Sequence, residues 1–164
     1  MHQIPWGISR SRTARSAKRF FDPDYASVLQ RLIIEIVTEE RPMPVTSLTR
    51  AVAMRHGWQR TGGRIFAQVQ NGLHTVLVEE EFGTPFVWAP ADRAERVPFR
   101  GLGNRAIRDV SRTEIAWMID QNAVDLAATQ DPTLELAHRL GINRLSKDAR
   151  SYLDTSRQWQ AGGS

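Results

Sequence analysis

A short turn of the form Gly-x-x-Arg occurs twice in this chain and constrains its fold more than any other feature. The copies are Gly57-Trp58-Gln59-Arg60 and Gly141-Ile142-Asn143-Arg144, and 141 − 57 and 144 − 60 both give 84. In each copy the glycine follows an apolar helical pattern and can adopt the left-handed conformation that ends a helix. A second apolar pattern follows each turn. The sequence therefore predicts a helix-turn-helix unit that is repeated in tandem.

The first copy shows how the second helix of the unit begins. Thr61 offers a hydroxyl at the expected N-cap position, and Gly62 and Gly63 allow a backbone or a phosphate to approach closely. Ile65 then opens a new apolar face. We expect a helix from Thr61 or Gly62 onward that buries Ile65, Phe66, Val69 and Leu73.

Polar side chains follow the opposite face of that helix. Arg64, Gln68 and Asn71 recur at i, i+4 and i+7. Arginine can fork onto guanine, and glutamine or asparagine onto adenine, in the major groove of DNA. A solvated helix face carries the same residue types, so this stripe alone discriminates weakly.

Two further helices are expected before this turn. Asp22-Pro23-Asp24 supplies a helix start, and apolar residues at helical spacing follow it until Arg41-Pro42-Met43-Pro44 stops the helix. A second helix is predicted from Val45 to His56, and Gly57 closes it.

A β-hairpin is predicted after the third helix. Val76-Leu77-Val78 and Phe86-Val87-Trp88 are short β-type runs, and residues 79–85 between them suit a loop. Three helices and a hairpin occur in the order of a winged helix. Glu79, Glu80 and Glu81 would repel a phosphate backbone, so we expect a solvated wing that does not contact DNA.

The second copy begins after a segment rich in helix breakers. Ser111 and Glu114 have capping-box spacing, and Asp131-Pro132 marks another helix start. The predicted fold is mainly α (α+β): a winged helix-turn-helix with a small β-hairpin wing, followed by a second, wingless helix-turn-helix repeat. The expected organisation is a basic flexible arm over residues 1–21, a winged-helix domain over 22–92, a linker over 93–110, a second three-helix repeat over 111–160 and a flexible tail over 161–164.

The N-terminal residues carry cations without any acidic residue up to position 19. The formal net charge of the whole chain is only +4, so the distribution of charge says more than its total. A general use of arginine in place of lysine explains the composition equally well. The predicted basic arm contains Arg10, Arg12, Arg15, Lys18 and Arg19, and the alternative for this segment is a solvated tail.

Several functional classes find no support in the sequence. The chain has no cysteine, no signal-peptide pattern and no apolar segment of transmembrane length, so we expect a cytoplasmic protein without a membrane partner. The four histidines lack ligand spacing, and no Glu-x-Lys or Gly-x-Ser-x-Gly pattern occurs. We therefore expect no enzyme activity, no metal and no cofactor. The tryptophans invite a base-stacking role, but Trp58, Trp88 and Trp117 are expected to pack internally.

Four segments together carry a resemblance to a known family. They are the run from Gly57 to Ile65, Phe86-Val87-Trp88, Val97-Pro98-Phe99-Arg100 and the second turn at Gly141. In these segments the chain resembles the domain of unknown function 3320, over roughly Tyr25 to Trp159. That family is winged-helix-like and lies at the C-terminal end of bacterial superfamily I helicase and nuclease proteins. The resemblance implies a role in nucleic-acid transactions and brings no catalytic residues; this chain has no phosphate-binding loop and no helicase motor.

The leading hypothesis is a non-catalytic module that binds duplex DNA as an accessory to a helicase or nuclease in DNA processing or defence. The alternative is a protein–protein docking module for a helicase or nuclease partner. The predicted nucleic-acid-binding residues are Arg10, Arg12, Arg15, Lys18, Arg19, Arg60, Gly62, Gly63, Arg64, Gln68 and Asn71.

Overall fold

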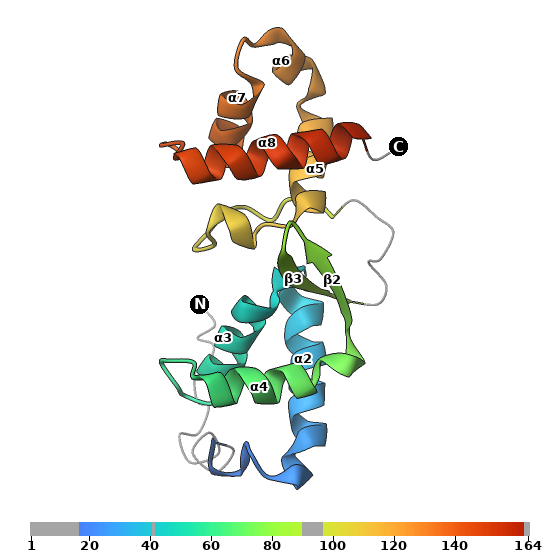
Figure 1. Ribbon diagram of the computed structural model, residues 1–164, viewed down its shortest axis with the longest axis vertical. Coiled ribbons are helices and arrows are strands. Elements are labelled where there is room, and N and C mark those ends of the chain that lie inside the picture. The colour runs from blue at the N-terminus through green and yellow to red at the C-terminus, as the bar shows by residue number, and fades with distance from the viewer. Residues whose placement is uncertain (1–16, 41, 90–96, 163–164) are drawn as a thin grey trace, which may run out of the picture. The chain divides into compact units, whose positions relative to one another are not determined.

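The computed structural model describes residues 17–40, 42–89 and 97–162 (Figure 1). They form mainly helices with one small three-stranded antiparallel sheet. Two compact units emerge: one takes residues up to 80 together with 84–89, and the other takes 81–83 together with the described residues from 97 on. Each unit has its own apolar core, so each is described by itself.

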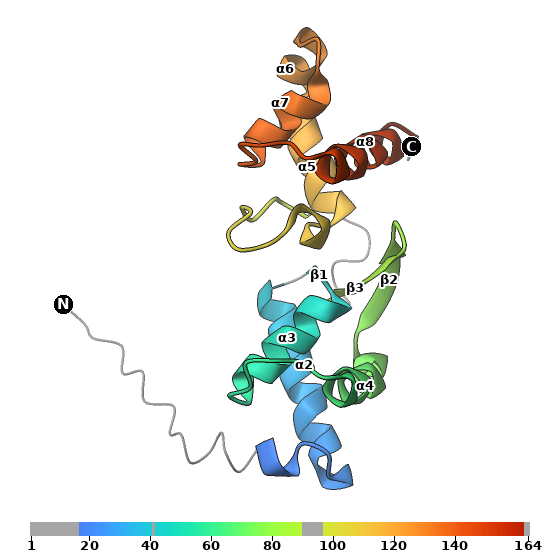
Figure 2. The same ribbon diagram turned by 60° about the vertical axis from the view of Figure 1, so that its left-hand side comes forward.

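The helices of the first unit follow the predicted order. Leu29, Ile33 and Ile36 form the buried stripe of the long helix α2, and Val69 is the fully buried residue of α4. Figure 2 shows α3 and α4 side by side, and the two helices are in contact. The helical elements are η1 (Pro23–Tyr25), α2 (Ala26–Glu40), α3 (Val45–Arg55), α4 (Gly63–Asn71) and η2 (Leu73–Thr75).

The sheet has the order β1-β3-β2. Its strands are β1 (Met43–Pro44), β2 (Leu77–Glu81) and β3 (Thr84–Trp88). Met43 pairs with Val87 and Pro44 pairs with Phe86, antiparallel. The Pro42–Pro44 segment was expected only to stop a helix, but it also supplies an edge strand, the position in a sheet that tolerates proline.

The connection between β2 and β3 is shorter than predicted. The expected loop over residues 79–85 is wrong, because the strands are joined by Phe82 and Gly83 alone. Both residues have positive φ angles, 50° and 81°, as a two-residue type I′ hairpin turn requires. Glu79 to Glu81 therefore belong to β2.

The first Gly-x-x-Arg turn forms as predicted at its glycine but not at its threonine. Gly57 has φ 78°, and its N–H donates to the carbonyl of Met54 at 3.0 Å. The N–H of Trp58 donates to the carbonyl of Ala53 at 3.0 Å, which completes a Schellman-type helix end. Thr61 is not the N-cap of the next helix; that position is Gly62, and no side chain caps it.

The second unit contains four α-helices among its described residues. Ser111 and Glu114 form the predicted capping box at the start of α5, and the Asp131 side chain accepts from the N–H of Leu134 at the start of α7. Leu136 and Leu153 lie fully buried in its core. The elements are η4 (Ile107–Asp109), α5 (Arg112–Gln121), α6 (Ala123–Ala128), α7 (Pro132–Arg139) and α8 (Lys147–Gly162).

The second turn makes the same hydrogen bonds as the first. Gly141 has φ 87°, and its N–H donates to the carbonyl of His138 at 3.0 Å. The N–H of Ile142 donates to the carbonyl of Ala137 at 2.9 Å. Each donor and acceptor lies at the repeat offset from its counterpart in the first turn, and α4 and α8 begin at residues related by the same offset.

Two segments expected to be irregular are part of the second unit. Within the predicted linker 93–110, residues 97–110 supply Phe99, Leu102 and Ile107 to the second core, and Val110 is fully buried. Within the predicted tail 161–164, residues 161 and 162 continue α8. The Gln160 side chain donates to Asp120 at 2.9 Å and holds this last turn against α5.

No helix in the described part of the chain is long and apolar enough to cross a bilayer.

Candidate nucleic-acid interface

Two exposed arginines lie on either side of the N-terminus of α4. Arg60 is in the turn before the helix, and Arg64 is in its first turn. Neither makes an ion pair with any described residue. Arg55, at the end of α3, instead pairs with Glu35 and Glu39 at 3.1 Å. The charge of Arg60 and Arg64 is therefore available to an external anion.

The N-terminus of α4 offers its own hydrogen-bond donors to such an anion. Gly62, the N-cap, provides no side-chain bond, and the first turn holds no acidic residue. A Cβ atom added to Gly62 or Gly63 would meet no heavy atom within 4 Å, and Gly62 has φ −105°, which any residue can adopt. Packing does not require glycine at either position, and both residues are exposed at the end of a helix where N–H groups lack intrahelical partners.

The start of α8 shows how the repeat satisfies these groups internally. The Ser146 hydroxyl accepts from the N–H of Ala149 at 3.1 Å. Asp148 lies in the first turn, where Arg108 donates to it at 2.7 Å and lowers the pKa of its carboxyl. The N-terminus of α8 is thus capped and neutralised by the chain itself, whereas no side chain in the described part of the chain caps α4.

The N-terminal segment lies against the first turn of α4. Phe20 is fully buried, and the guanidinium carbon of Arg64 lies 4.5 Å from the centroid of the Phe21 ring. Lys18 and Arg19 precede these aromatic residues and are exposed; Arg19 pairs with Asp22 at 3.7 Å. Arg10, Arg12 and Arg15, predicted to extend this basic surface, lie outside the described residues.

The three residues of the predicted base-reading stripe differ in their exposure. The amide of Gln68 donates to the backbone carbonyl of Phe20 at 3.4 Å, and its side chain is half-buried. Arg64 and Asn71 remain exposed. Helical spacing predicts that all three side chains share one face of the helix, but it does not reveal the bond between Gln68 and Phe20.

Aromatic side chains pack around the residues that flank Gly57 in the turn. The sequence did not predict this cluster. The Tyr25 hydroxyl bonds the Nε2 of the buried His56 at 2.8 Å, and His56 Nδ1 lies 2.7 Å from the carbonyl of Val52. Because a carbonyl only accepts, Nδ1 carries the proton. Trp58 stacks on His56 with ring centroids 5.2 Å apart, and Phe20 meets both rings edge-on. The residues flanking Gly57 in the sequence are the only signal for this cluster.

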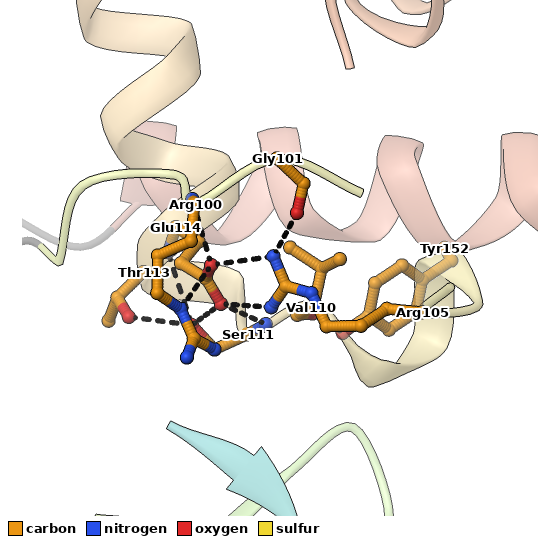
Figure 3. Close-up of polar contacts among 8 residues, drawn as sticks. All are labelled: Arg100, Gly101, Arg105, Val110, Ser111, Thr113, Glu114 and Tyr152. Atoms are coloured by element: carbon orange, nitrogen blue, oxygen red, sulfur yellow. Dashed lines mark hydrogen bonds and ion pairs between the residues drawn. The ribbon is translucent and has the colours of Figure 1, made fainter. Parts of the chain in front are cut away.

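Most of the described arginines of the second unit make ion pairs within it. Figure 3 shows the carboxylate of Glu114, which is fully buried, between Arg100 and Arg105. Arg105 reaches both carboxylate oxygens at 3.0 Å, and the Arg100 Nε donates at 3.3 Å. Ser111 adds bonds from its N–H and hydroxyl at 3.3 Å. This network joins residues 100–105 to the start of α5.

Glu81 is buried, which corrects the expectation that the whole acidic run of the wing is solvated. It is 1% exposed, and its carboxylate accepts from the backbone N–H of Arg112, in the first turn of α5, at 2.8 Å. A carboxylate is favourable at this end of a helix. The run Glu79 to Glu81 is therefore not a uniformly solvated charge run, although Glu80 is exposed.

Arg144 and Lys147 differ from the other described arginines of the second unit. Both are exposed, and neither makes an ion pair with a described residue. Arg144 occupies the same position in its turn as Arg60 does in the first. Across the described residues, no three His, Asp or Glu side chains gather as a metal site would need.

One family model matches part of the chain, and the matched residues include the α3–α4 turn. No curated protein and no solved structure matches the chain. The matching family model ends within α4, so it spans the aromatic cluster and the turn but neither the hairpin nor the second unit. Residues 18–67 match the model of a family described as a protein of unknown function (DUF3320).

Proposed function

We propose that this protein is a non-catalytic module that binds duplex DNA through the α3–α4 turn of its first unit. The observation that carries the proposal is a pair of exposed arginines, Arg60 and Arg64, on either side of an uncapped glycine N-terminus; neither pairs with a carboxylate of the described residues. Backbone amides and arginines together are the usual ligands of a phosphate group. In this proposal the module is a cytoplasmic accessory to a helicase or nuclease.

The proposed architecture is a winged helix followed by a wingless copy of its helix-turn-helix. Three helices and a hairpin succeed one another in the first unit, and α4 takes the place of the recognition helix. The two turns share the same left-handed glycine and the same backbone bonds, which supports descent from one repeated unit.

Each predicted residue has a distinct part in the proposed interface. Arg60 and the amides of Gly62 and Gly63 hold a phosphate, which positions the module without reading sequence. Arg64 and Asn71 face the major groove. Gln68 retains Phe20, so base reading depends on Arg64 and Asn71. The arm that ends at Lys18 and Arg19 adds affinity that does not depend on sequence.

A fluorescence-anisotropy titration with a short labelled duplex at low salt tests the proposal. The double variant Arg60→Ala/Arg64→Ala should bind about tenfold more weakly than the wild type, because two phosphate or base contacts are lost. Arg31→Ala is the matched control: this arginine is exposed on α2, and among the described residues it bonds only the carbonyl of Ser27. Equal affinities for the wild type and the double variant count against the proposal.

The second candidate is a docking module for a helicase or nuclease protein. The observation that favours it is the position of β2, an edge strand that exposes Val78 and Glu80. An extended basic segment of a partner could add to this edge. A complex with such a partner that survives Arg64→Glu but is lost with Val78→Pro would favour docking over DNA binding.

A further inference from the structure

An open hollow lies beside the turn of the first unit, in addition to the proposed phosphate site. Its lining comes from the N-terminal segment, the turn and the first turn of α4. The lining residues are Phe21, Gly57, Trp58, Gln59, Arg60 and Ile65.

The hollow combines an apolar, aromatic wall with a cationic edge. Phe21 is 41% exposed, and Trp58 is half-buried, with His56 stacked on its ring. Ile65 adds an aliphatic surface. Arg60 lines the hollow, and Arg64 lies against the Phe21 ring. No acidic residue is part of the lining.

This composition fits a ligand that joins a flat apolar group to an anion. A nucleotide has that chemistry: its base stacks on aromatic side chains, and its phosphate pairs with arginine. A base within an intact duplex is stacked on both faces and paired with its partner base. It cannot enter such a hollow without leaving the helix. A base at the end of a strand that extends beyond the duplex is free to do so.

We infer that this hollow binds the first unpaired base of a DNA strand where it leaves a duplex, with Phe21 and Trp58 as the stacking surface and Arg60 on the adjoining phosphate. This inference rests on the proposed function, because the duplex part of the same DNA occupies the α3–α4 turn. It narrows the substrate from duplex DNA to a duplex with a single-stranded extension.

The test compares the binding of two DNAs to the 164-residue chain. One is a blunt duplex, and the other is the same duplex with one unpaired 2-aminopurine, whose fluorescence is quenched when it stacks. We expect the extended duplex to bind about tenfold more tightly than the blunt one, within the range for stacking one base. We also expect 2-aminopurine fluorescence to fall on binding.

Substitutions in the hollow test which residues cause the tighter binding of the extended duplex. Phe21→Ala should lower the ratio of the two affinities towards one and relieve the quenching, and Trp58→Ala should do the same if circular dichroism shows that it is folded. Met54→Ala is the control, because this side chain is 69% exposed on α3 and does not line the hollow. It should leave the ratio unchanged.

The outcomes separate this inference from the proposed function. Failure to bind the blunt duplex contradicts the proposed function. If the protein binds the blunt and the extended duplex equally well, the inference is overturned while the proposed function stands. Quenching that persists in Phe21→Ala has the same consequence. A labelled acidic, tyrosine-containing peptide that displaces the unpaired base and binds more tightly than the extended duplex also overturns it, because the hollow would then serve a protein ligand.

Discussion

The amide of Gln68 donates to the backbone carbonyl of Phe20, so a residue of α4 anchors the segment that leads to the basic N-terminus. The same segment places Phe21 under the guanidinium of Arg64. The N-terminal residues and the α3–α4 turn therefore form one continuous surface of the first unit. We therefore predict a structural role for Gln68.

Gln68→Ala should lower the free energy of unfolding by about 0.5–1 kcal/mol, because the 3.4 Å bond to Phe20 is long and only part-buried. Gln70→Ala, an exposed neighbour on the same helix, should change stability far less. Urea unfolding followed by circular dichroism measures both. Unchanged stability of Gln68→Ala, together with an altered base preference, would show that Gln68 reads DNA instead.

Glycine substitutions should separate folding from binding. Gly57→Ala should destabilise the first unit by about 1–2 kcal/mol, because a side chain is disfavoured at φ 78°. Gly63→Ala should leave the unit as stable as the wild type or stabilise it by up to about 1 kcal/mol, because the position is helical and its surroundings are open. Its duplex affinity should nevertheless fall, because the added methyl group limits the approach of a phosphate. Thermal melting and the duplex titration test the pair, and undiminished binding by Gly63→Ala would contradict close approach at this site.

Loss of the buried carboxylate of Glu114 should strongly lower the stability of the second unit. Glu114→Gln should destabilise the second unit by about 3 kcal/mol, because Arg100 and Arg105 would lose the charge that compensates them in a part-buried site. Glu135→Gln removes one of two carboxylate partners of Arg139, the other being Asp125, and should cost at most about 1 kcal/mol. Chemical denaturation compares them, and equal losses would mean that the Glu114 network is no stronger than a surface ion pair.

The start of α7 should respond to acid. The Arg150 side chain, together with the N–H of Leu134, lowers the pKa of Asp131 from 3.8 to about 2. A depressed carboxyl pKa stabilises the folded state above the unfolded value and loses that contribution as pH falls through the folded value. Wild-type stability should therefore fall between about pH 4 and pH 2 in part through Asp131. Asp131→Asn and Arg150→Gln should each make that fall shallower, as a series of acid melting curves would show.

Local patterns predicted the elements that depend on neighbouring residues. The left-handed Gly57, the Ser111–Glu114 capping box and the Asp131 cap are confirmed, because the atoms involved lie within one turn of chain. The two-residue hairpin turn was missed. Phe82 is a bulky residue with positive φ, and its ring packs against Tyr152 at 5.7 Å, a contact that no local rule contains.

Contacts distant in sequence account for the other differences. Glu81 is buried because Arg112 offers it a helix N-terminus, and a charge run alone indicates only solvent exposure. Gln68 is half-buried, and its amide donates to the backbone of Phe20, which lies 48 positions earlier in the chain. The His56 and Trp58 cluster likewise depends on Phe20 and Tyr25, which precede α2.

The salt dependence of duplex binding tests the central claim most directly. A plot of the logarithm of the association constant against the logarithm of salt concentration falls by about 0.9 for each phosphate that a cation neutralises. Arg60→Ala should make this slope shallower by about 1, while Arg31→Ala should keep the wild-type slope. A slope for Arg60→Ala equal to that of the wild type would contradict phosphate binding at the α3–α4 turn.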